Sequence, residues 1–528
     1  MKKALLAIGS GLLLALGWPT YGIPLLLFFA FVPLLFVEHS IRNSEIKRKK
    51  LTVFGLSYLS FFIWNYITTN WLQYADIFGA SFAILVNSAL MASIIVIYHS
   101  ISKRTTTNKA LIFLIALWIS FEKLHLGWEF SWPWLNLGNG FSEYYTWIQW
   151  YEYTGTFGGT LWVWLVNILV FKSLVNATKP ELKIIIKPLA LKVVILITIP
   201  IIASLISYNT YSNKGDTVQV VALQPNIDPY GDKYNKTNMQ FANLLVELAE
   251  TKITDRTDFV LAPETYFADN IRVKQFDNSL LKHKLKSFVN AHPNLNILTG
   301  ISFINFIHNK ADVKPQSNVL KKNLWYDDYN SAILINNTND VQLYNKSKLV
   351  VGVENFPYQS VLKPLIGDKM IDLGGTVAMK TTQDHRSVFT GINPKFKAAP
   401  IICYESVYGE YVTEYARNGA NFLAIITNDA WWNNTQGHKQ HLSYARLRAI
   451  ETRRDVVRSA NTGVSAIINA KGDIVKQLEY DTQGALAGEI TTNNTLTVYT
   501  KIGDLIARMS IFVMLGILFI AYFRKDKV

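Results

Sequence analysis

The sequence predicts a chain in two parts: a multi-pass α-helical membrane domain, followed by an α/β domain with one further membrane helix after it. Half of the 528 residues are hydrophobic and only 17% are charged, which is too apolar for a soluble protein of this length. Long uncharged runs fill residues 1–209. A mixed sequence then extends to about residue 502, and a last apolar run precedes the final "FRKDKV".

Eight apolar stretches approach or reach the roughly 20 helical residues that cross a bilayer core of about 30 Å. The expected spans lie near residues 4–19, 21–38, 52–72, 79–99, 108–122, 158–175, 188–208 and 503–523. Seven of them form a transmembrane domain at 1–209, and the eighth forms a C-terminal helix with a short cytoplasmic tail at 503–528. Lys2 and Lys3 before an apolar run also fit a signal peptide, but no small-x-small site follows, so we expect a retained helix.

The distribution of lysine and arginine predicts the orientation of these spans. The positive-inside rule counts these residues in short loops close to helix ends. With eight spans, the basic clusters at residues 2–3, 42–50, 103–109, 172–187 and 524–527 all fall on one side. We therefore expect both termini in the cytoplasm and residues 210–502 outside it. The net charge of +14 then reflects topology and attraction to anionic lipid, and no nucleic-acid partner is expected.

Strand and helix patterns alternate between residues 210 and 502. "TVQVVAL" at 217–223 and "DFVLAPET" at 258–265 are typical of strands, and the segment between them has apolar residues at helical spacing. The order continues with a helix near 279–290, then "NILTGISF", "SAILIN", "APIIC", a helix over 407–417 and "FLAIITNDAWW". This alternation predicts a layered α/β domain, in which reactive residues tend to lie at the carboxyl ends of strands.

Cys403, the only cysteine of the chain, follows one predicted strand and precedes an amphipathic helix. A strand, a sharp turn and a helix expose a nucleophile beside free backbone N–H groups. The commoner alternative is a buried, unreactive cysteine. Outside the cytoplasm, however, an unpaired thiol is open to oxidation and has no intrachain disulfide partner, so its retention favours nucleophilic catalysis.

A thiol needs a base or a nearby cation to react at neutral pH. No histidine stands at a comparable strand end, and His438 and His441 are expected to form a pair on a helix surface. Two other strand ends offer Glu264 in "LAPETYF" as a proton acceptor and Lys346 in "LYNKSKL" as a positive charge for an oxyanion. No His/Cys cluster has ligand spacing and no cofactor-binding glycine loop is found, so neither a metal nor a cofactor is expected.

In this order, the three motifs resemble the Glu-Lys-Cys triad of the nitrilase (carbon-nitrogen hydrolase) superfamily. Over nearly its full length, the chain resembles the membrane-integral branch of that superfamily, the apolipoprotein N-acyltransferase family. The resemblance rests on the eight-span plan and on "PWLNLG" at 133–138, "LQPNI" at 223–227, "PET" at 263–265, "YNKSKLV" at 344–350, "CYE" at 403–405, "NDAWW" at 428–432, "HLSYARLRAIE" at 441–451 and "RSANTGVSA" at 458–466. It implies that residues 210–502 form a periplasmic catalytic domain with a nitrilase-like αββα sandwich.

The resemblance implies roles residue by residue. It makes Glu264 the base, Lys346 the triad lysine and Cys403 the nucleophile. Lys348 is the alternative lysine, and Lys346 is preferred because it holds the Y-x-K position. The residues implied in oxyanion stabilisation or substrate binding are Tyr404, through its backbone N–H, and Glu354, Glu405, Trp431 and Trp432.

The sequence departs from the family most after the lysine. The usual H-L-V-P-F-G-E-Y-V-P becomes "KLVVGVENFP", which keeps Glu354 and Pro357 but loses the first proline, the aromatic residue and the glycine of that pattern. Beyond it, the apolar segment 356–373 and the pair Trp431 and Trp432 either enter the membrane interface or pack on their own domain. Both interpretations stay open for both features.

The implied function is phospholipid-dependent N-acylation of the α-amino group of an S-diacylglyceryl-cysteine at an apolipoprotein N-terminus, the last step of lipoprotein maturation. The acyl chain passes from a phospholipid, with phosphatidylethanolamine as the expected donor, to Cys403 as a thioester and then to the amine. The implied location is the bacterial cell inner membrane. Two alternatives are a membrane-anchored nitrilase-type amidase and a non-catalytic lipid-binding membrane protein. Few charged residues lie in the spans, which argues against an ion pathway.

Overall fold

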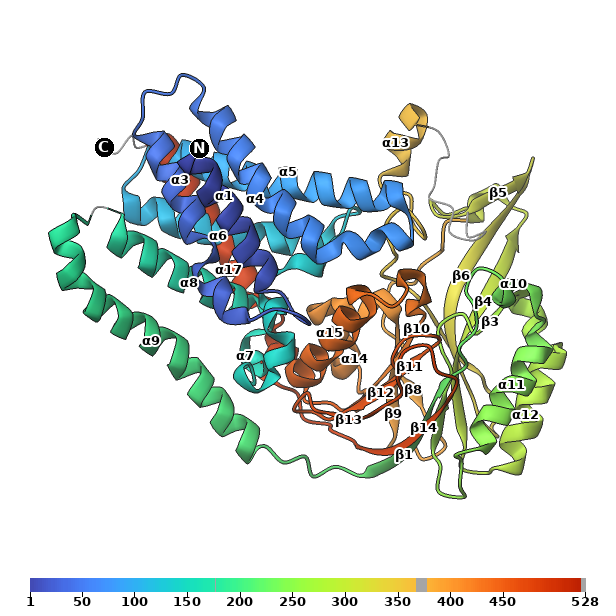
Figure 1. The fold of residues 1–528 in the computed structure, drawn as a ribbon. Helices are drawn as coiled ribbons and strands as arrows, with labels where there is room; N and C mark the ends of the chain where they lie inside the picture. Colours follow the sequence, from blue (N-terminus) through green and yellow to red (C-terminus); the bar gives the residue numbers. More distant parts are fainter. Residues whose placement is uncertain (176, 367–377, 524–528) are drawn as a thin grey trace. The chain divides into compact units, whose positions relative to one another are not determined.

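A computed structural model describes residues 1–175, 177–366 and 378–523. Contacts between residues divide the chain into two compact units. Unit 1 is helical and contains residues 1–73, 77–210 and 502–528, and unit 2 contains 74–76 and 211–501. Figure 1 shows helices alone in the first unit and mixed sheets with helices in the second. The predicted fold class, a multi-pass helical membrane part with an α/β part, is confirmed.

Seven helical stretches among the described residues are long and apolar enough to cross a membrane, and they cover 24–42, 49–74, 77–101, 107–127, 156–174, 180–210 and 505–523. The first expected span, 4–19, forms a shorter helix of fifteen residues. The helices of unit 1 are α1 (Lys2–Leu16), α2 (Leu27–Ala30), α3 (Val32–Arg42), α4 (Lys49–Thr69), α5 (Ile77–Ile101), α6 (Thr107–Gly127), α7 (Tyr151–Thr154), α8 (Thr156–Leu174), α9 (Lys179–Thr210) and α17 (Leu505–Phe523).

The last helix, α17, packs against α6 within unit 1. Phe113 of α6 and Ala521 of α17 share one buried apolar cluster, and Ile119 and Ala507 share another. The ammonium of Lys123 lies 2.7 Å from the carboxylate of Asp504 just before α17. Residues from the end of the chain therefore complete a unit that begins at residue 1.

Unit 2 contains two sheets. The eight-stranded sheet has the order β14-β1-β2-β4-β6-β5, with β3 paired to β4 and β7 paired to β6. Its strands are β1 (Thr217–Gln224), β2 (Phe259–Leu261), β3 (Phe267–Arg272), β4 (Asn296–Ile307), β5 (Asn318–Lys321), β6 (Leu324–Ile335), β7 (Gln342–Asn345) and β14 (Gly484–Thr491). Strands β1, β2 and β4 run parallel, as the alternation of strands and helices predicts.

The second sheet has six strands in the order β13-β12-β11-β10-β9-β8. These are β8 (Phe389–Thr390), β9 (Lys397–Ile402), β10 (Phe422–Thr427), β11 (Val456–Ala460), β12 (Ala466–Ile468) and β13 (Ile474–Gln477). The three central strands, β9, β10 and β11, are parallel and buried along their length apart from the first residue of β9. Their carboxyl ends therefore lie side by side at one edge.

The two sheets are packed face to face, with helices on the outer faces. One apolar core joins them, with Val220 and Leu261 from the first sheet and Ile425 and Val457 from the second. Figure 1 shows α11 (Asn238–Glu250) and α12 (Leu280–Ala291) outside the first sheet, and α14 (Gly409–Arg417) and α15 (Gln436–Thr452) outside the second. Three short helices complete the unit: α10 (Asp232–Asn235), α13 (Gln359–Ile366) and α16 (Val498–Ile502). The predicted αββα sandwich is thus present.

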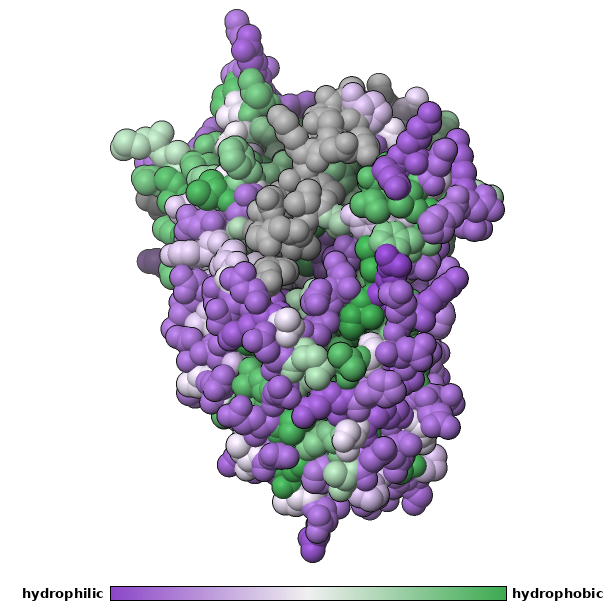
Figure 2. Space-filling model, turned by 90° about the vertical axis from the view of Figure 1, so that its right-hand side faces the viewer, coloured by the Kyte–Doolittle hydropathy of each residue, from purple (hydrophilic) through white to green (hydrophobic). Residues whose placement is uncertain are grey.

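The helix layer over the first sheet is amphipathic. Phe241, Leu245 and Leu285 are buried against that sheet. The hydroxyl of Thr237 accepts from the backbone of Gln240, whose side chain accepts in return, so α11 begins with a capping box. Figure 2 shows that the outer face on this side is mainly hydrophilic. This layer has the surface of a water-exposed α/β domain.

Candidate active site

Each residue of the predicted triad lies just beyond a strand of unit 2. Glu264 follows β2 after two residues, Lys346 follows β7 directly, and Cys403 follows β9 directly. All three are buried, with 7%, 1% and 7% of their surfaces exposed. The charges of Glu264 and Lys346 both shift the pKa of the Cys403 thiol, so the structure brings the three groups within electrostatic reach of one another.

Lys346 lies between two carboxylates. Its ammonium is 2.8 Å from Oε1 of Glu264 and 2.9 Å from Oε2 of Glu354. Asn330 on β6 donates its side-chain N–H groups to the same two residues, at 2.8 Å to Glu264 and 3.0 Å to Glu354. Sequence reasoning missed Asn330, because an asparagine inside a strand pattern carries no signal of its own. A buried cation between two acids, which an amide in turn holds in place, is a preorganised electrostatic site.

The altered loop after the lysine still directs its glutamate to the site. The Val350 N–H donates to Oε2 of Glu354 at 2.9 Å, and the Glu354 N–H donates to the Val350 carbonyl at 2.9 Å. Lys348, the alternative triad lysine, is half-buried with its ammonium 5.0 Å from the centre of the Tyr408 ring. Lys346 donates to both Glu264 and Glu354.

The electrostatics of the group leave the thiol protonated at rest. Burial and the Glu264 carboxylate raise the pKa of Cys403 well above its usual value, and Lys346 opposes them. Burial raises the pKa of Glu264, but the Lys346 ammonium outweighs it and holds that pKa below its ordinary value. Burial lowers the pKa of Lys346, but Glu264 and Glu354 outweigh it and raise that pKa well above the ordinary value. At neutral pH, the site holds an SH group, a carboxylate and an ammonium.

The backbone of Cys403 has a φ of +50°, in the left-handed region that a residue with a side chain rarely adopts. It opens the 3₁₀ turn η7 (Cys403–Val407) at the end of β9. Such a conformation costs about 1–3 kcal/mol and persists only where the surroundings fix it. It is the sharp strand-to-helix turn that the sequence predicts for the nucleophile.

Glu405 lies in a separate network that fixes this turn. Its Oε1 accepts from the hydroxyls of Tyr344 and Tyr411, each at 2.6 Å, and from the Ser347 N–H at 2.7 Å. Its Oε2 accepts from the Ile402 N–H at 2.9 Å. Because both oxygens receive donors from the protein, this carboxylate ties the end of β9 to the segment after Lys346.

The other predicted residues lie around the turn. Tyr404 is buried, with its ring 5.3 Å from that of Tyr408 in an edge-on contact. Trp431 is half-buried, edge-on to Tyr230 at 5.2 Å. Trp432 is half-buried, with its ring 5.6 Å from that of His441.

The segment predicted at 356–373 is described only in part. Its first residues lead into α13, where the Val361 side chain is 59% exposed. Residues 367–373 lie outside the described residues. A role of this segment at a membrane therefore stays a prediction.

The prediction that His438 and His441 form a helix-surface pair is wrong. Both are buried, with 2% and 1% exposed, because α15 packs closely on the second sheet and buries polar as well as apolar side chains. The absence of a simple apolar stripe in "HKQHLSYARLRAIE" led to the error, since amphipathic spacing is the usual signal of a half-buried helix.

Lys233 is a further group that sequence reasoning missed. It is buried, and its ammonium donates to the Thr265 hydroxyl at 2.5 Å, one residue after Glu264. The ammonium also lies 6.0 Å from the centre of the Trp431 ring. Burial lowers the pKa of Lys233 to about 8. The only available signal was a lysine inside a turn-like segment, "DPYGDKYN", which predicts a loop.

Cys403, Asp429 and His441 place one potential metal ligand each within 4.8 Å of one another. The ligand atoms of Asp429 and His441 are already engaged. Asp429 pairs with the Arg458 guanidinium, and His441 Nε2 faces the Ser406 hydroxyl and the Cys403 carbonyl. A guanidinium beside the carboxylate disfavours a second cation, so this set does not fit a metal ion.

Comparisons with known proteins match both units. The family model described as "Apolipoprotein N-acyltransferase N-terminal domain" matches residues 10–169, and "Carbon-nitrogen hydrolase" matches residues 217–498. The apolipoprotein N-acyltransferase of Chlorobaculum tepidum is 27% identical and aligns over 99% of this chain and 97% of its own length. Apolipoprotein N-acyltransferase 1 of Treponema denticola is 26% identical, over 95% of this chain and 92% of its own. A variant of the Nesterenkonia AN1 amidase from the nitrilase superfamily, a solved structure, covers 56% of this chain and 98% of its own at 12% identity, with a TM-score of 0.38. The family matches confirm the resemblance seen in the motifs.

Proposed function

The chain belongs to the carbon-nitrogen hydrolase family, and from that membership we propose that it is an acyltransferase that N-acylates apolipoproteins through a thioester on Cys403. The observation that carries the proposal is the Lys346 ammonium held between Glu264 and Glu354, next to a buried thiol. The names of relatives that match nearly the whole chain support the acyl acceptor class.

In the first half of the reaction, Sγ of Cys403 attacks the sn-1 ester carbonyl of a phospholipid, with phosphatidylethanolamine as the expected donor. The thiol proton passes to Glu264 as the S–C bond forms, because the raised thiol pKa and the ionised carboxylate make a free thiolate at rest unfavourable. Lys346 and the Tyr404 N–H stabilise the oxyanion. The C–O bond then breaks, and Glu264 returns the proton to the leaving oxygen, which gives a lysophospholipid and a thioester.

In the second half, the free α-amine of an S-diacylglyceryl-cysteine attacks the thioester. Glu264 takes a proton from the amine, the C–S bond breaks, and the proton returns to Sγ. A thioester reacts with amines far more readily than the starting ester does, so two easier transfers replace one difficult one. Glu354 and Asn330 hold Lys346 and Glu264 in place during both halves.

The proposed location is the bacterial inner membrane, with unit 2 in the periplasm and both termini in the cytoplasm. The one-sided distribution of lysine and arginine supports this orientation. The proposed domain bounds are 1–209 for the membrane domain, 210–502 for the catalytic domain and 503–528 for the final helix and tail. Trp431 and Trp432 are proposed to border the substrate path, because they lie on the 3₁₀ turn that follows β10, beside the turn of Cys403.

The test is to incubate the purified full chain with phospholipid that carries a labelled acyl chain and to locate the label by peptide mass spectrometry. We expect a hydroxylamine-sensitive acyl group on Cys403, which added diacylated lipopeptide discharges onto its amine. Cys403→Ala is expected to lose both steps, and Cys403→Ser to accept the chain very slowly at best. Label that persists in Cys403→Ala contradicts the thioester. Release of free fatty acid with no lipopeptide product instead identifies a hydrolase.

A further inference from the structure

A network of buried polar side chains lies beneath the turn that carries Cys403. Its members come from the edge where β9, β10 and β11 end and from α15, and they are Ser406, Thr427, Asp429, His441 and Arg458. None of these residues is more than 1% exposed. Buried polar groups are costly unless they are hydrogen-bonded, so five fully buried polar side chains in one network need a role in the fold or the site.

His441 connects Asp429 to the backbone of the nucleophile. Its Nδ1 lies 3.0 Å from Oδ1 of Asp429, and its Nε2 lies 3.2 Å from the carbonyl oxygen of Cys403. The Ser406 hydroxyl donates to the same carbonyl at 2.7 Å and lies 2.9 Å from Nε2. Because a carbonyl and a carboxylate only accept, this arrangement calls for a donating Nε2–H toward Cys403 and a donating Nδ1–H toward Asp429.

Asp429 is itself held rigidly. The Thr427 hydroxyl donates to its Oδ1 at 2.8 Å, and the Arg458 guanidinium pairs with its Oδ2. Burial raises the pKa of Asp429, but Arg458 and His441 outweigh it and hold that pKa well below its usual range. A fixed carboxylate therefore orients the imidazole, which in turn holds the Cys403 carbonyl.

The left-handed backbone of Cys403 explains why this support matters. At φ +50° the residue is strained, and its carbonyl receives two donors from the network. We propose, resting on the proposed function, that His441 is a positioning residue which fixes this turn and with it the position of Sγ, which lies within 4.8 Å of a ring nitrogen of His441. It does not serve as the base, because its Nε2 points at the backbone carbonyl and the Ser406 hydroxyl.

Two substitutions of His441 separate these roles. The amide nitrogen of asparagine takes roughly the place of Nδ1, and that of glutamine takes roughly the place of Nε2. His441→Gln therefore keeps a donor for the Cys403 carbonyl, whereas His441→Asn keeps only the contact with Asp429. His438→Gln is the matched control, because His438 is equally buried on α15 and contacts Asn434 rather than the turn. Ser406→Ala removes the other side chain that donates to the Cys403 carbonyl.

The first measurement is the single-turnover rate of Cys403 acylation by phospholipid, with the thermal unfolding midpoint recorded alongside. We expect the acylation rate of His441→Asn to fall about 10²-fold, the usual effect of misplacing a reacting atom by about 1 Å. The rates of His441→Gln and His438→Gln are expected to stay within about threefold of wild type. The acylation rate of Ser406→Ala is expected to lie between the rates of His441→Asn and His441→Gln. Equal rates in His441→Asn and His441→Gln overturn the positioning role, whatever their unfolding midpoints.

The second measurement needs no acyl substrate. It therefore tests the positioning role of His441 independently of the proposed function. Iodoacetamide reports on Cys403 alone, because the chain has no other cysteine. We expect the same pH midpoint of alkylation in wild type and both His441 variants, with a plateau rate at least threefold different in His441→Asn. A pH midpoint that moves by more than one pH unit in both variants makes the imidazole a proton-transfer partner and overturns the proposal. An unchanged plateau rate in His441→Asn also overturns it.

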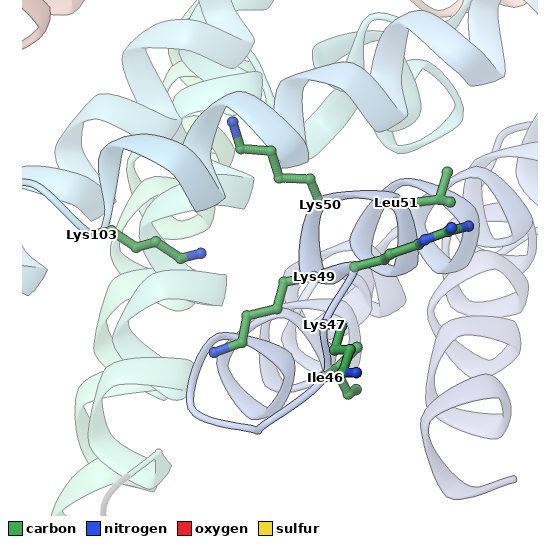
Figure 3. A pocket seen from close by; sticks show the side chains of 7 residues that line it. Ile46, Lys47, Lys49, Lys50, Leu51 and Lys103 are labelled. Carbon is green, nitrogen blue, oxygen red and sulfur yellow. The ribbon is translucent and has the colours of Figure 1, made fainter.

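A different observation, in unit 1, carries a second inference. A hollow of about 440 Å³ is lined by the cations Lys47, Arg48, Lys49, Lys50 and Lys103 together with Ile46 and Leu51. Figure 3 shows the side chain of Lys103 pointing toward the segment with Lys49 and Lys50. None of these seven described lining residues is acidic. Five cations without an acidic neighbour in the lining attract a compact anion.

The place of this hollow favours a lipid phosphate. It lies where α4 begins and α5 has just ended, at the ends of two expected spans, and Leu51 is 60% exposed beside it. Burial and the cations of Lys49 and Lys50 lower the pKa of Lys103, and Glu38 offsets them only in part, so an anion there relieves repulsion. We infer that the hollow binds the phosphate of an anionic phospholipid, with Leu51 against its acyl chain.

The test compares thermal unfolding midpoints of the full chain in neutral detergent with phosphatidylglycerol, phosphatidylcholine or inorganic phosphate. We expect phosphatidylglycerol alone to raise the midpoint, and the combined change of Lys49, Lys50 and Lys103 to glutamine to remove more than half of that shift. The control changes Lys183, Lys187 and Lys192 of α9 to glutamine, because these lysines carry the same charge but do not line the hollow. An equal loss in the control, or an equal shift from inorganic phosphate, overturns the lipid site.

Discussion

The ammonium of Lys346 lies 2.8 Å from Oε1 of Glu264, and both side chains are buried. The pair joins the end of β7 to the loop after β2, two segments far apart in sequence. Lys346→Ala leaves the carboxylates of Glu264 and Glu354 without the cation between them, whereas Glu264→Gln removes the proposed base while Glu354 still pairs with Lys346.

We therefore predict that Glu264→Gln and Lys346→Ala each reduce acyl-enzyme formation by about 10²- to 10³-fold. Lys348→Ala is the control, because its ammonium lies over the Tyr408 ring, and it is expected to lose much less. The measurement is the rate of labelled acyl transfer to Cys403. An inactive Lys348→Ala beside an active Lys346→Ala means that the two lysines are assigned in the wrong order.

The raised pKa of Cys403 predicts an alkaline shift in its reactivity. Burial and Glu264 disfavour the thiolate, so the rate of iodoacetamide alkylation is expected to rise only above the pKa of about 8.5 of a free thiol. Glu264→Gln removes a negative charge and should lower the midpoint, whereas Lys346→Met removes a positive charge and should raise it. A wild-type midpoint below that of a free thiol contradicts this account.

Gly300 on β4 holds the Glu264 segment at close range. A Cβ at this position would lie 2.3 Å from the backbone nitrogen of Thr265 and 2.5 Å from the carbonyl oxygen of Pro263. Gly300→Ala is therefore expected to displace Glu264 and to lower kcat at least tenfold without a change of charge, since small misplacements of catalytic groups are costly. Gly484→Ala is the control, because its Cβ would make only ordinary contacts. Equal kcat values for the two variants contradict the prediction.

Glu405 is predicted to act on stability through the turn it supports. Glu405→Gln replaces one accepting oxygen by an N–H group that faces donors, so we expect a loss of about 1–3 kcal/mol in the free energy of unfolding. A lower thermal unfolding midpoint of the purified chain is the expected readout. Wild-type stability together with a raised KM instead assigns this carboxylate to substrate binding.

The orientation in the membrane is tested by reporter fusions. A reporter joined after Leu223 is expected to be active only outside the cytoplasm, and one joined at Val528 only inside. The reverse pattern refutes the proposed periplasmic location of unit 2.

The sequence predicted the long, buried strands and the strand-end positions of Glu264, Lys346 and Cys403, because uninterrupted apolar runs followed by polar residues are a strong local pattern. Strands β3, β5 and β8 were not expected, nor was any strand after β10. The first three are two to six residues long, and pairing with neighbours rather than a pattern of their own defines them.

The supporting polar residues were the part of the site that sequence alone did not show. Asn330 and His441 act through partners that lie 66 and 12 residues away in the chain, Glu264 and Asp429. Such contacts depend on how the two sheets and α15 pack, which local composition does not encode. Burial of polar residues on α15 also removed the amphipathic spacing by which a helix face is usually assigned.

Because α17 supplies the packing partner of α6, unit 1 is not complete when the other membrane helices have been inserted. Until α17 has been made, Phe113 and Ile119 lack part of the apolar surface that covers them. The packing of α6 therefore has to wait until all of unit 2, which precedes α17 in the chain, has been synthesised. A stop codon just before residue 502 would keep the residues of unit 2 but leave unit 1 without the helix that packs on α6.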